Sequence, residues 1–269
     1  MGFQCIHQHF KMLYLRGFIV CICCIVLLIV QSGHGSEIID GKEVTPHSLP
    51  FMALLKDKTP ICGGILISPV WVLTAAHCGD IKEVLLGVHS INQEEKDSRQ
   101  VQEVKTFPHP CYDADDNVND LMLLKLKKPV KKTKTVQWRE LRNNIKAPTA
   151  GTKCLVAGWG KTKNNARGMS NVLKAVNVTV IDREKCNSPK YYNLKPFITS
   201  SMICAGTDGN NSADTCEGDS GGPILCNGQL IGVTSFGEQC GLKEKPGVYA
   251  FLSEKHLKWI KKTMKKSDI

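Results

Sequence analysis

The sequence predicts an all-β fold made of two β units, with one α-helix at the C-terminus. Its 269 residues suit one large all-β domain or two smaller ones. Hydrophobic residues make up 42% of the chain, which is ordinary for a globular protein and excludes a mainly disordered or fibrous one. Short apolar runs recur between turn residues, and a helical period is clear in one segment near the C-terminus.

The first segment, residues 1–35, is predicted to be a secretory signal peptide. An uncharged apolar run over 18–30 follows Lys11 and Arg16, and it precedes a small-x-small pattern that ends at Gly35. At about 1.5 Å per residue this run is too short to cross a membrane comfortably. A signal anchor that stays in the membrane is the alternative. The thirteen cysteines of the chain favour an oxidising compartment, and hence a secreted protein.

Short apolar or alternating runs, bounded by Gly, Pro, Asn and Asp, predict the strands of a sandwich or barrel. They lie at Phe51–Leu55, Gly64–Ile67, Val70–Thr74, Leu121–Leu126, Cys154–Val156, Val176–Ile181, Ile224–Leu225 and Leu230–Ser235.

Two further segments complete the expected architecture. The polar and basic stretch Lys127–Pro148 is interpreted as the link between the two β units. The stretch Lys255–Lys266 predicts the helix, because Leu257, Ile260 and Met264 fall on one face with lysines elsewhere.

Ser220 lies among glycines in Gly218-Asp219-Ser220-Gly221-Gly222-Pro223, a setting typical of a nucleophile. The G-x-S-x-G spacing also fits the nucleophile elbow of α/β-hydrolases. That fold needs an acid and then a histidine after the serine, whereas only His256 follows here and the βαβ pattern is missing.

A histidine and an acid come before this serine instead. His77 stands in T-A-A-H-C, and Asp120 stands in N-D-L-M-L-L at the start of an apolar run. With G-D-S-G-G-P, these motifs resemble those of the chymotrypsin-like (trypsin-fold) serine proteases, and the resemblance covers residues 38–269. It implies two packed antiparallel six-stranded β-barrels with a C-terminal helix, and a serine endopeptidase activity.

The resemblance also implies a role for each residue of the catalytic set. His77 is expected to take the proton of Ser220, and Asp120 to fix the tautomer of His77 and stabilise its protonated form. The backbone N–H groups of Gly218 and Ser220 are expected to form the oxyanion hole. Ser235 matches the family position that hydrogen-bonds the buried aspartate.

Activation is expected to free the amino group of Ile38, whose I-I-D-G sequence resembles the start of the mature family enzymes. The ammonium would pair with Asp219, because a buried carboxylate without a cation is costly. Signal cleavage after residue 35 would leave Ser36-Glu37, which resembles the acidic dipeptide that a dipeptidyl peptidase removes from granzymes. The alternative is a longer propeptide cut by an unknown enzyme.

Specificity for Lys or Arg is expected from Asp214, six residues before the serine, which matches the base of the family's primary pocket. Gly237 and Gly247 match the pocket walls, and Ser235 belongs to the same substrate-binding set. A buried acid left unpaired by an apolar substrate enforces this kind of selectivity. The alternative is a solvated loop acid.

The cysteines that remain after signal removal are odd in number, so one has no partner within the chain. Cys111 is left over, in a P-H-P-C-Y-D context that resembles the segment of granzyme A whose cysteine links two subunits, so a disulfide-linked homodimer is expected. A free thiol is the alternative. The family spacing implies the bonds Cys62–Cys78, Cys154–Cys226, Cys186–Cys204 and Cys216–Cys240.

The formal charge of +10 remains strongly positive in the mature chain. Lysines gather in the Lys125–Lys134 and Lys255–Lys266 stretches, and they are interpreted either as a solvated face or as a surface for acidic proteoglycan. Sequons at Asn177 and Asn210 are glycosylation candidates. No sequence-reading nucleic-acid motif, zinc-type motif or cofactor motif is present, and no membrane partner is expected.

The leading hypothesis is therefore a secreted or granule-stored endopeptidase that cleaves after Lys or Arg and resembles granzymes A and K. One alternative is a cationic protein that kept the protease fold for binding, although such relatives typically lose a catalytic residue. The other is a digestive or mast-cell tryptase.

Overall fold

The computed structural model describes residues 41–267, except 94–97, 162–167, 208–213 and 239. Two units divide the chain, Met1–Gly35 and Ser36–Ile269, and all the described residues belong to the second. The predicted signal peptide and the Ser36-Glu37 dipeptide therefore lie outside the described residues. Within the described ranges, the structure contains no helix that is long and apolar enough to cross a membrane.

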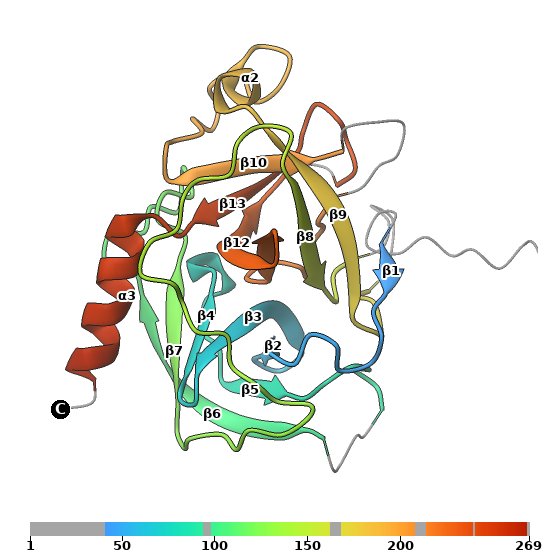
Figure 1. Cartoon of the computed structure of the whole chain (residues 1–269), viewed down its shortest axis with the longest axis vertical. Coiled ribbons are helices and arrows are strands. Elements are labelled where there is room, and N and C mark those ends of the chain that lie inside the picture. The colour runs from blue at the N-terminus through green and yellow to red at the C-terminus, as the bar shows by residue number, and fades with distance from the viewer. Residues whose placement is uncertain (1–40, 94–97, 162–167, 208–213, 239, 268–269) are drawn as a thin grey trace, which may run out of the picture. The chain divides into compact units, whose positions relative to one another are not determined.

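The first half of the described chain forms a closed antiparallel barrel (Figure 1). Its strands pair in the order β2-β3-β4-β7-β6-β5. Their bounds are β2 Met52–Lys56, β3 Pro60–Ser68, β4 Trp71–Thr74, β5 Glu83–Leu86, β6 Gln100–Pro108 and β7 Met122–Leu126.

The second half forms another closed antiparallel barrel, because β8 pairs with both β9 and β11. The short strand β1 joins its edge by pairing with β9. The bounds are β1 Lys42–Glu43, β8 Lys153–Gly158, β9 Lys174–Ile181, β10 Met202–Gly206, β11 Pro223–Cys226, β12 Gln229–Phe236 and β13 Gly247–Phe251. The expected architecture of two six-stranded barrels is thus confirmed.

The burial of the strands follows their sequence patterns. In β9 the alternation is strict, since Val176, Val178 and Val180 are buried while Asn177 between them is exposed. Strand β3 is apolar and buried along most of its length because it lies in the barrel core. Each of the eight predicted runs corresponds to part of a strand.

Five strands escape the sequence-based prediction: β1, β5, β6, β10 and β13. Strand β6 reads Q-V-Q-E-V-K-T-F-P and alternates between half-buried and exposed positions, so its apolar signal is weak. Strand β13 reads G-V-Y-A-F and is fully buried, but a run of five such residues does not distinguish a strand from a buried helix segment.

Two α-helices and a single-turn 3₁₀ helix are present in the described ranges. Helix α3, Glu254–Lys266, matches the predicted C-terminal helix and buries Leu257 and Ile260; the N-cap Ser253 accepts a hydrogen bond from the backbone N–H of His256. Helix α2, Arg183–Asn187, is too short for a periodic signal. The 3₁₀ helix η1, Ala76–Cys78, follows β4 directly. The segment from 127 to 148 carries no helix or strand and connects the barrels.

Candidate active site

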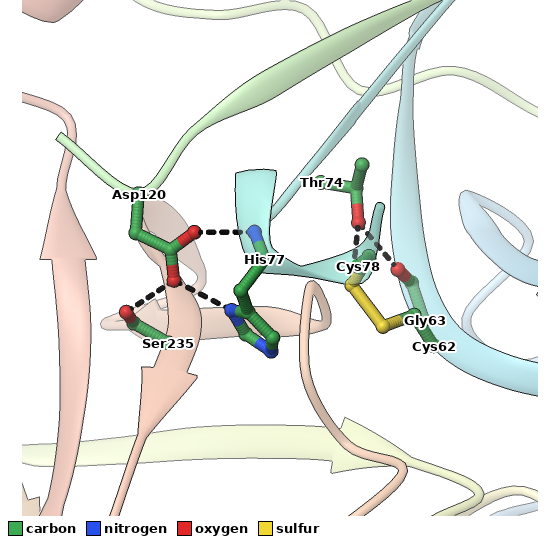
Figure 2. Close-up of polar contacts among 7 residues, drawn as sticks. All are labelled: Cys62, Gly63, Thr74, His77, Cys78, Asp120 and Ser235. Atoms are coloured by element: carbon green, nitrogen blue, oxygen red, sulfur yellow. Dashed lines mark hydrogen bonds and ion pairs between the residues drawn. A yellow bond between two sulfur atoms is a disulfide. The ribbon is translucent and has the colours of Figure 1, made fainter. Parts of the chain in front are cut away.

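His77 lies on η1, where the chain leaves the first barrel. The disulfide Cys62–Cys78 fastens this turn to β3, and the Thr74 hydroxyl donates to the Gly63 carbonyl just before it (Figure 2). The His77 side chain remains 29% exposed. The backbone of His77 is therefore fixed to the first barrel, while its imidazole remains accessible to solvent.

Asp120 lies two residues before β7 and its side chain is fully buried. The carboxylate accepts from the His77 backbone N–H at 2.9 Å and lies 2.7 Å from His77 Nδ1, and the Ser235 hydroxyl donates to the same oxygen as Nδ1 (Figure 2). Burial alone would raise the pKa of Asp120. The hydrogen bonds and charge of His77, with the Ser235 bond, hold that pKa below its ordinary value. The group is thus an anion that orients the imidazole.

Ser220 lies in the turn before β11, and this turn is fastened to the first barrel. The backbone N–H of Gly63 donates to the Ser220 carbonyl at 2.8 Å. Gly221 has φ of +79°, and a Cβ there would lie 2.1 Å from the Thr74 hydroxyl and 2.3 Å from the Gly63 carbonyl. Only glycine allows the backbone at 221 to come this close to Thr74 and Gly63. This close contact places the serine, which belongs to the second barrel, beside strands of the first.

The backbone N–H groups around the serine differ in whether they have a carbonyl partner. The neighbouring amides of Asp219, Gly221 and Gly222 all donate to backbone carbonyls. Within the described parts of the chain, the amides of Gly218 and Ser220 have no such carbonyl partner. Gly218 has φ of +96°, which glycine adopts without strain. Two amides without a carbonyl partner next to Ser220 fit the oxyanion hole expected from the sequence.

A cleft of about 560 Å³ brings five of the predicted site residues together, whereas Asp120, Gly218 and Gly247 do not line it. His77, Ser220, Asp214, Ser235 and Gly237 all line it. Its other lining residues are Tyr112, Ala114, Asn117, Thr215, Cys216, Glu217, Thr234, Phe236 and Cys240. The sequence did not single out Tyr112, Asn117 or Thr215 as site residues.

Asp214 is a buried acid that lines this cleft. Its carboxylate accepts from the backbone N–H groups of Thr215, at 2.8 Å, and Gly241, at 2.9 Å. Burial raises its pKa to about 7, against the lowering effect of these backbone donors. A Cβ on Gly247 would lie 3.0 Å from the Asp214 carboxylate, whereas one on Gly237 would meet no atom closer than 3.7 Å. Gly247 thus keeps the surroundings of the acid open.

Asp219 directly precedes the serine and has no exposed surface. Its carboxylate accepts from the backbone N–H groups of Gly160, at 2.8 Å, and Cys216, at 2.9 Å. Burial raises the pKa of Asp219 to about 6 despite these two bonds. Ile38, its expected partner, lies outside the described residues.

The described part of the chain contains four disulfides, and they join the pairs that the sequence resemblance implies: Cys62–Cys78, Cys154–Cys226, Cys186–Cys204 and Cys216–Cys240. Cys111 is an exposed free cysteine. In the described ranges, one group of metal-type ligands lies close together, formed by Cys62, His77 and Cys78. Both sulfurs in it are bonded to each other, so they are not thiolate ligands.

The structure describes one of the two predicted glycosylation sites. Asn177 is exposed on β9, as an acceptor for a glycan must be. Asn210 lies outside the described residues.

The fold and the cleft together define the class of this protein: it is a serine protease built on two β-barrels. The comparisons with known proteins give its family. Residues 38–260 match the Trypsin family model, and the chain belongs to that family.

Relatives and solved structures agree with this assignment. The chain is 48% identical over 230 residues to granzyme A of Bos taurus, covering 84% of this chain and 88% of that protein. It is 40% identical over 240 residues to kallikrein-8 of Rattus norvegicus, covering 87% and 89% respectively. The structure of neuropsin, a serine protease expressed in the limbic system of mouse brain, aligns with a TM-score of 0.75 at 40% identity, covering 84% of this chain and 99% of that one.

Proposed function

We propose that the protein is an endopeptidase that cleaves peptide bonds after Lys or Arg, with His77, Asp120 and Ser220 as its catalytic triad. The observation that carries this proposal is the buried carboxylate of Asp214 in the same cleft as the serine and the histidine. A cationic side chain is the complement of such a group, because it restores the charge balance that burial removes.

The chemistry follows from the contacts of the triad. Because His77 Nδ1 faces the Asp120 carboxylate, Nδ1 carries a proton and Nε2 is free to accept the proton of Ser220. The serine oxygen then attacks the substrate carbonyl. The negative oxygen of the tetrahedral intermediate accepts hydrogen bonds from the amides of Gly218 and Ser220.

Collapse of this intermediate breaks the C–N bond, and His77 returns the proton to the leaving amine. A water molecule then attacks the acyl-enzyme, gives its proton to His77 and releases the new carboxylate with the serine restored. Asp120 stays ionised throughout, because its hydrogen bonds to His77 and Ser235 favour the anion.

Specificity follows from the charge of Asp214. A Lys or Arg side chain in the pocket pairs with the carboxylate, whereas an apolar side chain leaves it buried and unpaired. Glu217 also lines the cleft and pairs with Lys161, so part of its charge is already neutralised.

Activation is proposed to require a new N-terminus at Ile38. The buried Asp219 accepts two backbone donors, and its raised pKa indicates that its anion lacks compensation in the uncleaved chain. We expect a dipeptidyl peptidase to remove Ser36-Glu37 after signal cleavage. The free ammonium would then supply the missing cation.

Storage in a secretory or cytotoxic granule is proposed from the basic surface. Lys125 of β7 donates to the Ser267 carbonyl at the end of α3, and Lys261 of α3 donates to the Asn143 side chain of the link. Helix α3 therefore lies against β7 and the link (Figure 1), so the two lysine groups of the sequence share one region. Those exposed in it are Lys127, Lys128, Lys131, Lys132, Lys134, Lys255, Lys258, Lys261, Lys262, Lys265 and Lys266.

Acidic proteoglycan is the partner that such a surface fits, through many weak and salt-sensitive contacts. The test is elution from a heparin column, comparing the protein with a variant in which the lysines of 127–134 and α3 are replaced by glutamine. We expect the variant to elute at clearly lower salt. A second variant replaces Lys185 and Lys190, which are exposed elsewhere, and shows how much two lysines outside this surface contribute. Equal elution of all three proteins would end the proposal.

A disulfide-linked homodimer is proposed through Cys111, whose exposed position allows a second copy to approach. The granzyme-like role that we propose, in immune cytotoxic or inflammatory proteolysis, is supported by the 48% identity to granzyme A of Bos taurus.

The proposed function is tested with secreted protein that begins at Ile38. Matched peptides carry Arg, Lys, Phe or Asp before the scissile bond, and the variants are Ser220→Ala and Asp214→Ser. Turnover after Arg and Lys is expected, with both activities lost in the serine variant and the preference lost in the aspartate variant. Folded protein that turns over none of the peptides would favour the binding-protein alternative instead.

A further inference from the structure

Asn119 directly precedes the catalytic candidate Asp120, and its backbone is in an unusual conformation. Its φ is +55°, in the left-handed region that few residues other than glycine, asparagine and aspartate adopt. The backbone N–H of Leu121 donates to the Asn119 carbonyl at 2.7 Å, closing a tight turn around Asp120. The orientation of the Asp120 carboxylate therefore depends on how this turn is held.

The side chain of Asn119 is clamped between two distant segments. Its Nδ2 donates to the carbonyl of Cys111 at 2.8 Å, eight residues earlier in the chain. Its Oδ1 lies 3.0 Å from Nε2 of His256, which is 137 residues later, in the first turn of α3. One amide thus joins the start of β7 to the 111–119 loop and to the C-terminal helix.

The His256 side chain is held in place by burial and by its own contacts. His256 is 2% exposed, and its Nδ1 faces the carbonyl oxygen of Phe251. The ring of His109 packs edge-on against it with centroids 5.7 Å apart, and His109 also contacts the ring of Trp259. A buried ring with this packing has little freedom to move.

The contact between Asn119 and His256 can form in both protonation states of the ring, whereas the bond from Asn119 to Cys111 forms together with it when both ring nitrogens carry a proton. The Phe251 carbonyl can only accept, so Nδ1 carries a proton. In the imidazolium form Nε2 also donates, to Oδ1 of Asn119. In the neutral form, which burial favours by lowering the pKa of His256, a half-turn of the amide lets Nδ2 of Asn119 donate to Nε2 instead. Oδ1 then faces the Cys111 carbonyl, so the hydrogen bond to Cys111 is given up while the link to α3 is kept.

We propose that Asn119 and His256 are positioning residues for catalysis, which hold the turn that orients Asp120 toward His77. This inference rests on the proposed function, because it assigns a purpose to the Asp120 carboxylate. Neither residue contacts the cleft that holds Ser220. An effect that acts through the geometry of Asp120 belongs to the chemical step. Tyr112, Ala114 and Asn117 of the 111–119 loop do line the cleft, so a change confined to KM would point to that loop instead.

The test uses Asn119→Gly, because glycine adopts the positive φ without strain and the change removes only the side-chain bridge. His256→Phe removes the other end while keeping a ring. The matched control is Asn227→Gly, since Asn227 is exposed, has φ of +51° and lies in the β11–β12 turn. All variants are made in the activated chain, and kcat and KM are measured with an Arg peptide across pH.

We expect Asn119→Gly and His256→Phe each to lower kcat about tenfold and leave KM within about twofold. The double variant should lose no more than either single one, since both changes break one link. The acid limb of the kcat/KM profile should move to lower pH, because a displaced Asp120 stabilises protonated His77 less. The control should match the unmodified enzyme in every respect.

An unchanged kcat in a folded Asn119→Gly variant would overturn the inference, whatever happens to His256→Phe. A rise in KM with kcat preserved would overturn it as well, since it would place the effect in binding. Asp120→Asn is measured alongside. Full activity in that variant would refute the proposed triad itself, whereas its inactivity beside a normal Asn119→Gly refutes only the positioning role.

Discussion

Freeing the amino group of Ile38 should stabilise the folded chain, because the buried carboxylate of Asp219 then gains a cation. In the uncleaved chain this carboxylate accepts two backbone N–H groups, and its pKa is raised to about 6 from an ordinary value of 3.8. A carboxyl whose pKa is raised by folding destabilises the fold when it is ionised. The penalty is absent below the unfolded pKa and is complete above the folded one.

The size of the penalty follows from these two values. A difference of about two pKa units corresponds to about 3 kcal/mol near neutral pH. At about pH 5 the group is mostly protonated in the folded chain, and about half of the penalty remains. If the new ammonium removes the penalty, the melting temperature should rise by about 6–12 °C near neutral pH for a domain of this size.

Calorimetry of two matched chains measures this effect. One begins at Ile38 and the other one residue earlier, at Glu37, and both carry Ser220→Ala to prevent self-cleavage. The chain from Ile38 should melt higher at about pH 7.5, and the gap should shrink by about half at about pH 5. Equal melting temperatures at neutral pH would refute the pairing of Asp219 with the N-terminus.

Three further outcomes follow from the site. Gly221→Ala should lower the free energy of unfolding by more than about 3 kcal/mol in denaturant titrations, because its Cβ would lie 2.1 Å from the Thr74 hydroxyl. The control Gly228→Ala, at a positive φ with no atom near the new Cβ, should lower the free energy of unfolding by about 1 kcal/mol. The preference for Arg over Phe peptides, measured as a ratio of kcat/KM, should fall up to tenfold per pH unit below about pH 7, because Asp214 becomes neutral there; a constant ratio would contradict this. Cys111→Ser should abolish any dimer seen on non-reducing electrophoresis while leaving turnover of short peptides intact.

The sequence was sufficient to single out the residues of the proposed catalytic set, because short motifs with a fixed chain order carry them. His77, Asp120 and Ser220 are separated by 43 and 100 residues, yet each lies in a stretch whose glycines or neighbouring apolar residues mark it. No sequence motif indicates the hydrogen-bond bridge from Asn119 to His256. A lone histidine in a lysine-rich helix looks like a surface residue until the fold buries it against the 111–119 loop.

The strands likewise divide into those that the sequence predicts and those that it does not. Apolar strands in the barrel cores, such as β4 and β7, were predicted from composition. Strand β6 was missed because its neighbours in the barrel, rather than its own residues, determine its conformation. The cleft-lining Asn117 was missed for a related reason: its positive φ is a property of the folded loop, and the sequence gives only a weak preference for it.

The most direct test of the proposed mechanism is covalent labelling of the activated chain with a peptide fluorophosphonate carrying arginine at the reactive position. Mass spectrometry would locate the adduct. The proposed triad and pocket predict one adduct per chain, on Ser220, lost in His77→Ala and strongly reduced when phenylalanine replaces the arginine of the reagent. An adduct at another residue, or equal labelling by the two reagents, would contradict the account.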